Sequence, residues 1–599
     1  MRLVLTIVSF CLALVFLGAG IAQRTVFLKP DSVSMSIDAK TSNIYTVISA
    51  QALRQHSGAV TVTAQGSGPV VIAYGRTDDV QAWIGAAHYT RLSPEGANAL
   101  KASNVVPELT DVDPNVPVTG SPAGSDLWIS EVSGTGGASL NGELPEGTAA
   151  IIASDGQSPA PANIKVAWRL DSSTPWAGPL LSVGALFLLV GLVFLLFFLR
   201  DHLRGGGPRR KGPAGIEHQQ PSQKAITAKG PKRKELGPAR GRRTGGRVSR
   251  WITIPMIGVG AFALSGCSPS YWPSQTAHST AAASAQALSA DGQQKLEPAV
   301  TEAQAERILA QISSFTANAD STMAADTLSQ RFAGPALAAR LANYQIRAKK
   351  SDYAAPTPIP AAPITLTLPQ QVSNSWPRLV MTVSQDPSDS NLAPVALVML
   401  QDSPRVNYHV YYAMTLAPKA TSPRLAPATI GAPRVPVDSK LVEIAPNEVA
   451  SAYGDVLTND TSSAYNSLFN ADDDTLRQQL GAAGQADVRS KLPANAAIAF
   501  SASSGNGPAL GFATIDGGAL VAVEVSQQRK ITPTDGGVVG FGDGSASALL
   551  SGFAGKSARG VQSTTSLQVL FYIPAVGSTD HTRVIGWTAN LIAASEIPG

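Results

Sequence analysis

The sequence predicts a multidomain membrane protein, with a β-rich domain between two transmembrane helices and a tandem α+β region in the C-terminal half. Two long apolar segments bracket a region of short alternating runs. A strongly basic stretch follows the second apolar segment, and the last part of the chain twice shows helical periodicity followed by strand-like runs. Only 15% of residues are charged, and the chain holds 54 Gly and 42 Pro. This composition suits a membrane protein with loop-rich outer domains.

The first apolar segment covers residues 3–22, which is long enough to cross a bilayer core of about 30 Å. Its last residues, Gly20-Ile21-Ala22, also resemble a cleavage site, so a removable signal peptide is the alternative. The apolar run exceeds the usual apolar core of a signal peptide. We therefore expect a retained anchor, within a first domain of residues 1–24.

Residues 25–175 are expected to form an extracytoplasmic β-rich domain, because short alternating runs are separated by Gly, Pro, Ser and Asp clusters. This spacing favours a β-sandwich. Only 92–102 resembles a helix, with Ser93-Pro94-Glu95 as its start. The predicted strands cover 59–63, 70–74, 127–131, 149–153 and 164–168, and the side chains of His56, His88, Asp78 and Asp79, which lack metal-ligand spacing, are expected to be solvated or locally hydrogen-bonded.

The second apolar segment, 176–199, carries no charged residue and predicts a transmembrane helix. Arg200 and Arg204 close it, and Trp176 marks the opposite membrane interface. Residues 200–250 hold 15 Lys and Arg against 3 Asp and Glu, which leaves 31 basic and 39 acidic residues elsewhere. The positive-inside rule then places this loop in the cytoplasm and the flanking domains outside.

The basic loop, 200–250, has no apolar periodicity and is expected to be disordered. Nucleic-acid binding is the alternative function, but stacking aromatics and a folded module are missing from the loop. Attraction to anionic lipid headgroups explains it better, so we expect a membrane partner and no nucleic acid. The basic patches are Arg209, Arg210, Lys211, Lys232, Arg233, Lys234, Arg242 and Arg243.

Residues 251–267 resemble an internal lipoprotein signal. The apolar part, 251–264, spans about 21 Å as a helix, which is too short for a bilayer but typical of a signal-peptide core. It ends in Leu264-Ser265-Gly266-Cys267, the pattern of a lipobox, in which the exported thiol is acylated and a peptidase cuts before it. The alternatives are a short hydrophobic hairpin or an ordinary span with an incidental cysteine. Residues 268–296, rich in Ala, Ser and Thr, fit a flexible tether.

The region after the tether is expected to contain two α+β domains, 297–435 and 436–599. In the first, Thr301 to Gln304 fits a capping box and 322–348 predicts a second helix. In the second, Pro446 suits a helix start, and Asp516-Gly517-Gly518 predicts a hairpin turn. Helices followed by antiparallel strands suggest a cystatin-like or NTF2-like fold; the predicted strands cover 378–384, 394–400, 405–416, 509–515, 519–525, 566–573 and 583–592.

No catalytic constellation emerges from the sequence. Asp472-Asp473-Asp474 could hold a divalent cation, as in a sugar-nucleotide site, but after Asn470 and before a helical pattern it fits a helix cap better. His278, His409 and His581 are isolated, and Gly555-Lys556-Ser557 lacks the first glycine of a P-loop. The two cysteines, Cys11 and Cys267, leave no disulfide framework. We therefore expect no catalytic, cofactor-binding or metal-ligating residue.

Over residues 297–597 the chain resembles an uncharacterised family of actinobacterial membrane-anchored envelope proteins. The resemblance is carried by Trp376-Pro377-Arg378, by the segment 514–521 (TIDGGALV) and by 571–574 (FYIP). Some relatives carry a glycosyltransferase label, which no motif in this sequence supports. The resemblance implies location and architecture, without an established activity.

These features together predict a non-enzymatic protein of the cell membrane whose folded domains are extracytoplasmic and contact envelope proteins or cell-wall material. Cleavage before Cys267 would divide the chain in two. One alternative is an enzyme acting on cell-wall glycan, with 472–474 as its acidic residues. The other is a scaffold component of an export apparatus.

Overall fold

The computed structural model describes residues 2–27, 30–96, 99–108, 118–170, 172, 174–204, 296–372, 375–389, 392–418 and 423–599. The chain divides into two compact units, Met1–Ser32 with Leu170–Gln286, and Val33–Arg169 with Ala287–Gly599. The predictions for most of the basic loop, for the internal signal-like segment and for the tether concern residues outside the described ranges.

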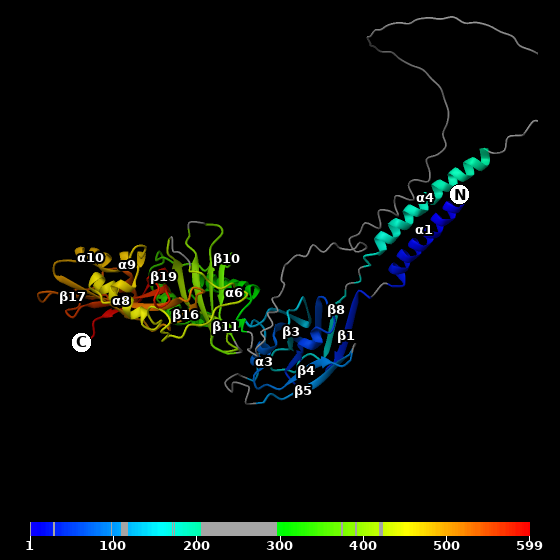
Figure 1. Cartoon of the computed structure of the whole chain (residues 1–599). Helices are drawn as coiled ribbons and strands as arrows, with labels where there is room; N and C mark the ends of the chain where they lie inside the picture. Colours follow the sequence, from blue (N-terminus) through cyan, green and yellow to red (C-terminus); the bar gives the residue numbers. More distant parts are fainter. Residues whose placement is uncertain are drawn as a thin grey trace, which may run out of the picture. The chain divides into compact units, whose positions relative to one another are not determined.

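The first unit is a pair of apolar helices, α1 (Arg2–Thr25) and α4 (Ala177–Arg204), which lie side by side (Figure 1). Both are long and apolar enough to span a membrane. Their contact includes stacked rings of Phe16 and Phe187, 5.8 Å apart. It also includes Gly20 and Gly184, where an added Cβ would collide with the other helix. Small residues at such points let two apolar helices approach closely.

The second unit begins with the N-terminal module, Val33–Arg169, whose strands form one mixed eight-stranded sheet in the order β1-β8-β3-β7-β2-β4-β5. The long strand β3 pairs with β8 through its first half, with β7 through its second half, and with β6 along its other edge. The elements are β1 (Ser32–Asp38), β2 (Tyr45–Ile48), α2 (Ala50–Leu53), β3 (Val60–Arg76), α3 (Thr77–Ile84), β4 (Tyr89–Pro94), β5 (Leu100–Val105), β6 (Ser130–Gly142), β7 (Thr148–Ala153) and β8 (Asn163–Arg169).

Two expectations for this module are wrong. The strands share one hydrogen-bonded sheet, with β2 and β4 parallel, instead of two antiparallel sheets. The segment 92–102 is a hairpin of β4 and β5 and not a helix. Gly96 supplies a positive φ of 73° in its turn, and the N–H of Glu95 donates to the carbonyl of Ala99. The cross-strand pairing decided this segment over its local helix signal.

The C-terminal module, 296–599, is built on one nine-stranded antiparallel sheet in the order β10-β12-β13-β14-β19-β18-β17-β15, with β16 paired to β17. Its two halves join where β14 meets β19 at Thr415 and Trp587. The strands are β10 (Ile364–Pro369), β12 (Arg378–Ser384), β13 (Val395–Gln401), β14 (His409–Leu416), β15 (Ala496–Ser504), β16 (Leu510–Ala513), β17 (Ala519–Pro533), β18 (Val561–Ile573) and β19 (Arg583–Glu596); β9 (Glu297–Pro298) pairs separately with β11 (Gln371–Val372).

Helices precede strands in both halves of this module. They are α6 (Glu302–Thr322), α7 (Gly334–Arg347), α8 (Val449–Asn459), α9 (Thr475–Leu480) and α10 (Ala482–Ser490), with α11 (Ala546–Ser551) between β17 and β18 and 3-10 turns at Ala325–Gln330, Asp460–Ser462 and Asn466–Leu468. The strands form one sheet across both halves, and a cystatin-like or NTF2-like identity for each half stays a prediction.

Local signals in the C-terminal module are largely confirmed. The capping box of Thr301 and Gln304 opens α6, and Thr514–Gly518 closes the β16–β17 hairpin. The single helix expected over 322–348 is wrong. It is interrupted because Met323 ends α6 in the left-handed conformation and Gly334, at φ 52°, opens α7. The helix expected at Pro446 begins at Val449.

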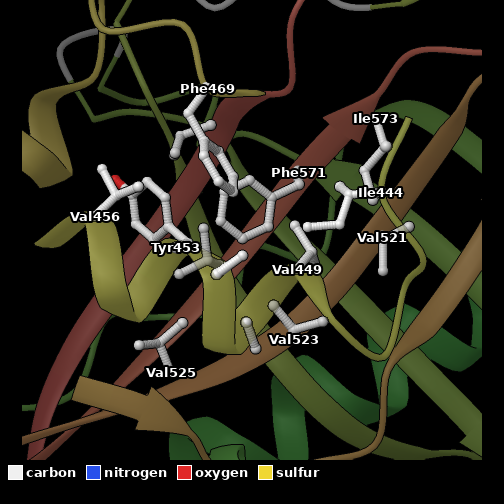
Figure 2. Close-up of a cluster of buried hydrophobic side chains, with 14 of the residues drawn as sticks. Ile444, Val449, Tyr453, Val456, Phe469, Val521, Val523, Val525, Phe571 and Ile573 are labelled. Carbon is white, nitrogen blue, oxygen red and sulfur yellow. The ribbon is translucent and has the colours of Figure 1, made fainter. Parts of the chain in front are cut away.

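Alternate residues of the central strands enter different apolar clusters, so the sheet is buried on both faces. One cluster lies between α8 and strands β17 and β18 (Figure 2). There the rings of Tyr453, Phe469 and Phe571 pack edge-to-face or tilted at 5.0–6.0 Å. Another cluster draws side chains from both halves, Leu379 and Met381 from the first and Phe512 and Tyr572 from the second. Because this cluster contains residues of both halves, the two halves share one apolar core.

Candidate functional site

In the described part of the chain, a group of buried charged side chains lies where the N-terminal module meets the C-terminal module. We call it the module interface. It combines two carboxylates of the N-terminal module with arginine, tryptophan and amide side chains of the C-terminal module. Its principal residues are Asp79, Asp126, Gln304, Arg307, Arg331, Trp376, Arg378, Arg405 and Asn407.

Asp79 is held between two arginines from different modules. It lies in the first turn of α3 and is 1% exposed, while its neighbour Asp78 faces solvent. Arg76 of the same module donates to it through Nε at 2.8 Å, and Arg378 of the C-terminal module donates through Nη2 at 2.7 Å. The expectation that Asp79 is solvated or only locally bonded is therefore wrong. The burial comes from the C-terminal module, which sequence periodicity in α3 cannot reveal.

Arg378 begins β12 and has no exposed surface. Its guanidinium carbon lies 3.8 Å from the ring centroid of Trp376, a cation–π geometry. The Trp376 ring in turn packs against the aromatic core of the N-terminal module, which contains Tyr45, Trp83 and Trp128. Residues 376–378 of the C-terminal module thus place a tryptophan ring and a buried guanidinium side by side against the N-terminal module.

Asp126 is completely buried in the turn before β6. Its carboxylate accepts hydrogen bonds from Arg331 Nη1 at 2.6 Å and Nη2 at 3.3 Å, and from the backbone N–H of Tyr408 at 2.8 Å. Its own N–H donates to Asn407 Oδ1 at 3.0 Å, and Asn407 Nδ2 donates to the carbonyl of Gly124. A carboxylate of one module is thus neutralised and hydrogen-bonded by the other, as a buried charge requires.

Helix α6 contributes donors to backbone carbonyls of the N-terminal module. Gln304 accepts from the Thr301 N–H through Oε1, which closes the capping box, and donates through Nε2 to the carbonyl of Leu127 at 2.9 Å. One turn along, Arg307 donates to the carbonyls of Asp126 and Trp128. Burial lowers the pKa of Arg307 below its usual value, although it stays protonated at neutral pH. The capping box therefore also orients an interface residue.

Arg405 also donates hydrogen bonds to the N-terminal module. It donates through Nε to the carbonyl of Trp83 at 2.7 Å and through Nη1 to that of Thr119 at 2.5 Å, and it lies over the Trp83 ring at 4.1 Å. Arg76 crosses in the opposite direction, donating to the carbonyls of Pro298 and Ala299. An open cavity of ≈ 270 Å³ beside Arg405 is lined by both modules. Its Arg405 and Asn407 side chains are already engaged in interface bonds.

The side chains of this group hold the two modules together by hydrogen bonds and ion pairs. Guanidinium groups donate to carboxylates and carbonyls in fixed geometry, and buried arginine and tryptophan dominate the binding energy of many interfaces. Tyr408, at the centre, has its pKa raised by burial, so its hydroxyl stays neutral at physiological pH. Glu131 nearby accepts from the Gly124 N–H, and burial raises the pKa of its carboxyl.

The three aspartates at 472–474 differ in burial and in hydrogen bonding. Asp474 is buried, caps α9 by accepting from the Arg477 N–H at 2.8 Å, and accepts from the Tyr453 hydroxyl at 2.6 Å. Asp472 and Asp473 are exposed. The helix-cap interpretation is thus confirmed for Asp474. Among the described residues, no three His, Cys, Asp or Glu side chains form a group that could hold a metal ion.

The histidines lie apart from this interface or at its margin. His88 is exposed, and His56 packs edge-on against Trp168 at 5.1 Å. His409 Nδ1 lies 4.0 Å from Asp402, and His581 Nδ1 lies 3.8 Å from Glu443. Burial lowers the pKa of His409. The lipobox Leu264-Ser265-Gly266-Cys267, His278 and the eight residues of the basic patches lie outside the described ranges.

In the sequence, Trp376-Pro377-Arg378 carries the family resemblance but indicates no role for these residues. The sequence does not indicate Arg307, Arg331 and Arg405, because a single arginine between apolar residues looks the same whether it faces water or a buried acid. The sequence feature that could have indicated the interface is a Trp and an Arg two positions apart, Trp376 and Arg378, at the start of an apolar strand.

The family model for a domain of unknown function, DUF8094, matches residues 296–596. The matched region includes all the residues that the C-terminal module contributes to the module interface. Comparisons with curated proteins and with solved structures return no match.

Proposed function

The chain belongs to the DUF8094 family of unknown function, and we propose that it is a non-enzymatic membrane protein of a cell envelope. It presents two extracytoplasmic modules as a binding or scaffold assembly for envelope proteins or cell-wall material. The observation that carries the proposal is the module interface, where Arg331 and Arg378 neutralise Asp126 and Asp79 across the modules. These contacts join the two modules into one assembly, which envelope proteins or cell-wall material would meet as a unit.

The module interface also supports a common location for both modules. The N-terminal module connects α1 to α4, so two spanning helices place it on one side of the membrane and the end of α4 on the other. Contact between the modules requires residues after 296 to return to the side of the N-terminal module. The basic residues after α4 favour the cytoplasm for the intervening loop. Both modules then lie outside.

An export signal within residues 205–295 meets this requirement. The apolar stretch 251–264 has signal-peptide length, and Cys267 is the acceptor that its lipobox predicts. The lipid anchor would hold the C-terminal module at the outer surface, with 268–296 as its tether, while the basic patches contact anionic lipids on the inner surface. No step of this role uses a cofactor.

Intact-mass measurement of the detergent-extracted protein tests the proposal. We expect a polypeptide beginning at Cys267 that carries an added lipid mass, together with a second polypeptide that ends before it. The Cys267→Ser variant serves as control and should remain uncut, whereas Cys11→Ser should behave as the parent. One uncut chain with an unmodified thiol at position 267 would overturn the lipid-anchor arrangement.

A further inference from the structure

We propose that the module interface alone, without a covalent connection, holds the C-terminal module on the N-terminal module. The partner of the DUF8094 domain is then the polypeptide containing residues 33–169 of the same protein, and the two pieces left by cleavage before Cys267 form one complex. The cleavage rests on the proposed function, whereas the interface itself does not.

Buried carboxylates of the N-terminal module are paired with arginines of the C-terminal module. Asp126 takes its guanidinium partner, Arg331, from the other module, and Arg378 donates to Asp79 while retaining no exposed surface. Separation would strip both carboxylates of donors that came from outside their own module. The pairs fix how the two modules match, and truncating one partner would leave the other charge buried and unpaired in the complex, which is strongly unfavourable.

The Trp376 ring provides an apolar contact between the modules. Trp376 belongs to the C-terminal module but packs against the N-terminal cluster that contains Tyr45, Trp83 and Trp128. The guanidinium carbon of Arg405 lies 4.1 Å from the ring centroid of Trp83. A tryptophan packed on the partner's aromatic cluster, with the buried Arg378 guanidinium 3.8 Å from its ring, has the residue types that dominate interface hot spots. Covalent linkage through a long intervening segment is not needed to place it.

The interface residues of both modules are held in place by the folded structure of their own module. Each module has its own apolar core, one around Trp83 and Ile151 in the N-terminal module and others between helices and sheet in the C-terminal module. The interface residues Asp79, Gln304 and Arg378 lie on regular elements α3, α6 and β12. Association then orders few additional groups, which lowers its entropic cost.

The test uses the full chain in detergent, with a site for a sequence-specific protease introduced after Ala287 and an affinity tag at the C-terminus. After complete cutting, the C-terminal fragment is captured. We expect the N-terminal fragment to be retained, including at about 1 M salt, where the Debye length of about 3 Å screens exposed charge pairs but not buried ones. Loss of the N-terminal fragment into the flow-through in moderate salt would overturn the proposal.

Two variants place the effect in the interface. Arg378→Ala and Trp376→Ala should each weaken retention at least ten-fold, measured as the dissociation rate of the cut fragments. Arg340→Ala is the matched control, because Arg340 makes a buried pair with Asp320 at 2.7 Å entirely within the C-terminal module. It should leave the dissociation rate unchanged.

A folding control separates loss of binding from loss of structure. Each variant is also examined uncut, and its far-ultraviolet circular dichroism should match that of the parent. Dissociation of Arg340→Ala as fast as Arg378→Ala would contradict the assignment of retention to this surface. An uncut, unlipidated natural protein would refute the proposed processing and leave this experiment valid, because the cut is introduced.

Discussion

Arg378 and Asp79 are 299 positions apart in the sequence, yet Nη2 of Arg378 lies 2.7 Å from a carboxylate oxygen of Asp79. Both side chains are at most 1% exposed. The pair joins the start of β12 in one module to the first turn of α3 in the other. It is the clearest single contact through which the two modules of this unit recognise each other.

Neutralising Asp79 should destabilise the full chain. We expect Asp79→Asn to lower the free energy of unfolding by about 3 kcal/mol, because Arg378 and Arg76 would lose their shared carboxylate in a buried site. Urea denaturation followed by tryptophan fluorescence measures this change, since Trp83 and Trp376 lie beside the pair. Glu143→Gln, at an exposed position of the same module, should change stability by no more than about 0.5 kcal/mol. Equal effects of the two substitutions would contradict the buried pairing.

The acidic run at 472–474 should separate into structural and dispensable positions. Asp474→Ala removes both the α9 cap and the acceptor of the Tyr453 hydroxyl, and should cost about 2–3 kcal/mol of stability. Asp474→Asn should cost less, because it retains an acceptor and removes a carboxylate whose pKa burial raises. Thermal unfolding measures both variants. Asp472→Ala combined with Asp473→Ala should leave the transition unchanged, and a shift as large as that of Asp474→Ala would refute this division.

The helix pair should depend on the glycine at position 184. A Cβ there would lie 2.7 Å from Cγ and 2.9 Å from the backbone nitrogen of Leu17, so Gly184→Val should weaken the α1–α4 contact. Cysteines placed at Phe16 and Phe187, whose rings stack, report the contact by disulfide formation in membranes. Gly18→Val is the control, because nothing lies within 4 Å of its Cβ position. Unchanged cross-linking in Gly184→Val would argue against this packing.

Stability should fall steeply above about pH 10. Burial raises the pKa of Tyr74, Tyr408 and Tyr453, whereas the unfolded chain ionises its tyrosines near pH 10. Above that pH the unfolded chain binds fewer protons than the folded chain, so each such tyrosine contributes a loss of about 1.4 kcal/mol per pH unit. Absorbance at the phenolate band and circular dichroism should change together for these residues. Complete ionisation of all tyrosines with retained structure would contradict their burial.

The sequence predicts local structure correctly where a few neighbouring residues decide it. The capping box at Thr301, the strand at 378–384, the hairpin turn at Asp516 and the cap at Asp474 all depend on contacts within a short stretch. The two apolar helices follow from length and composition.

Other features depend on partners distant in the sequence and could not be predicted from it. The segment 92–102 pairs β4 with β5, and β2 lies beside β4, so sheet contacts prevailed over a helical pattern. The module interface is the extreme case, since Asp126 and Arg331 are 205 positions apart. Without a second sequence to show pairwise variation, one charged residue carries no information about which opposite charge it meets.

Labelling with a membrane-impermeant maleimide tests most directly whether both modules lie on the same, outer side of the membrane, as we propose. Cysteines are introduced one at a time at the exposed positions Lys165 and Lys491, and at Lys232 in the basic loop. Each is compared with the parent chain. We expect labelling of Lys165→Cys and Lys491→Cys in intact cells, and of Lys232→Cys only after lysis. Labelling of one module and protection of the other in intact cells would contradict this placement.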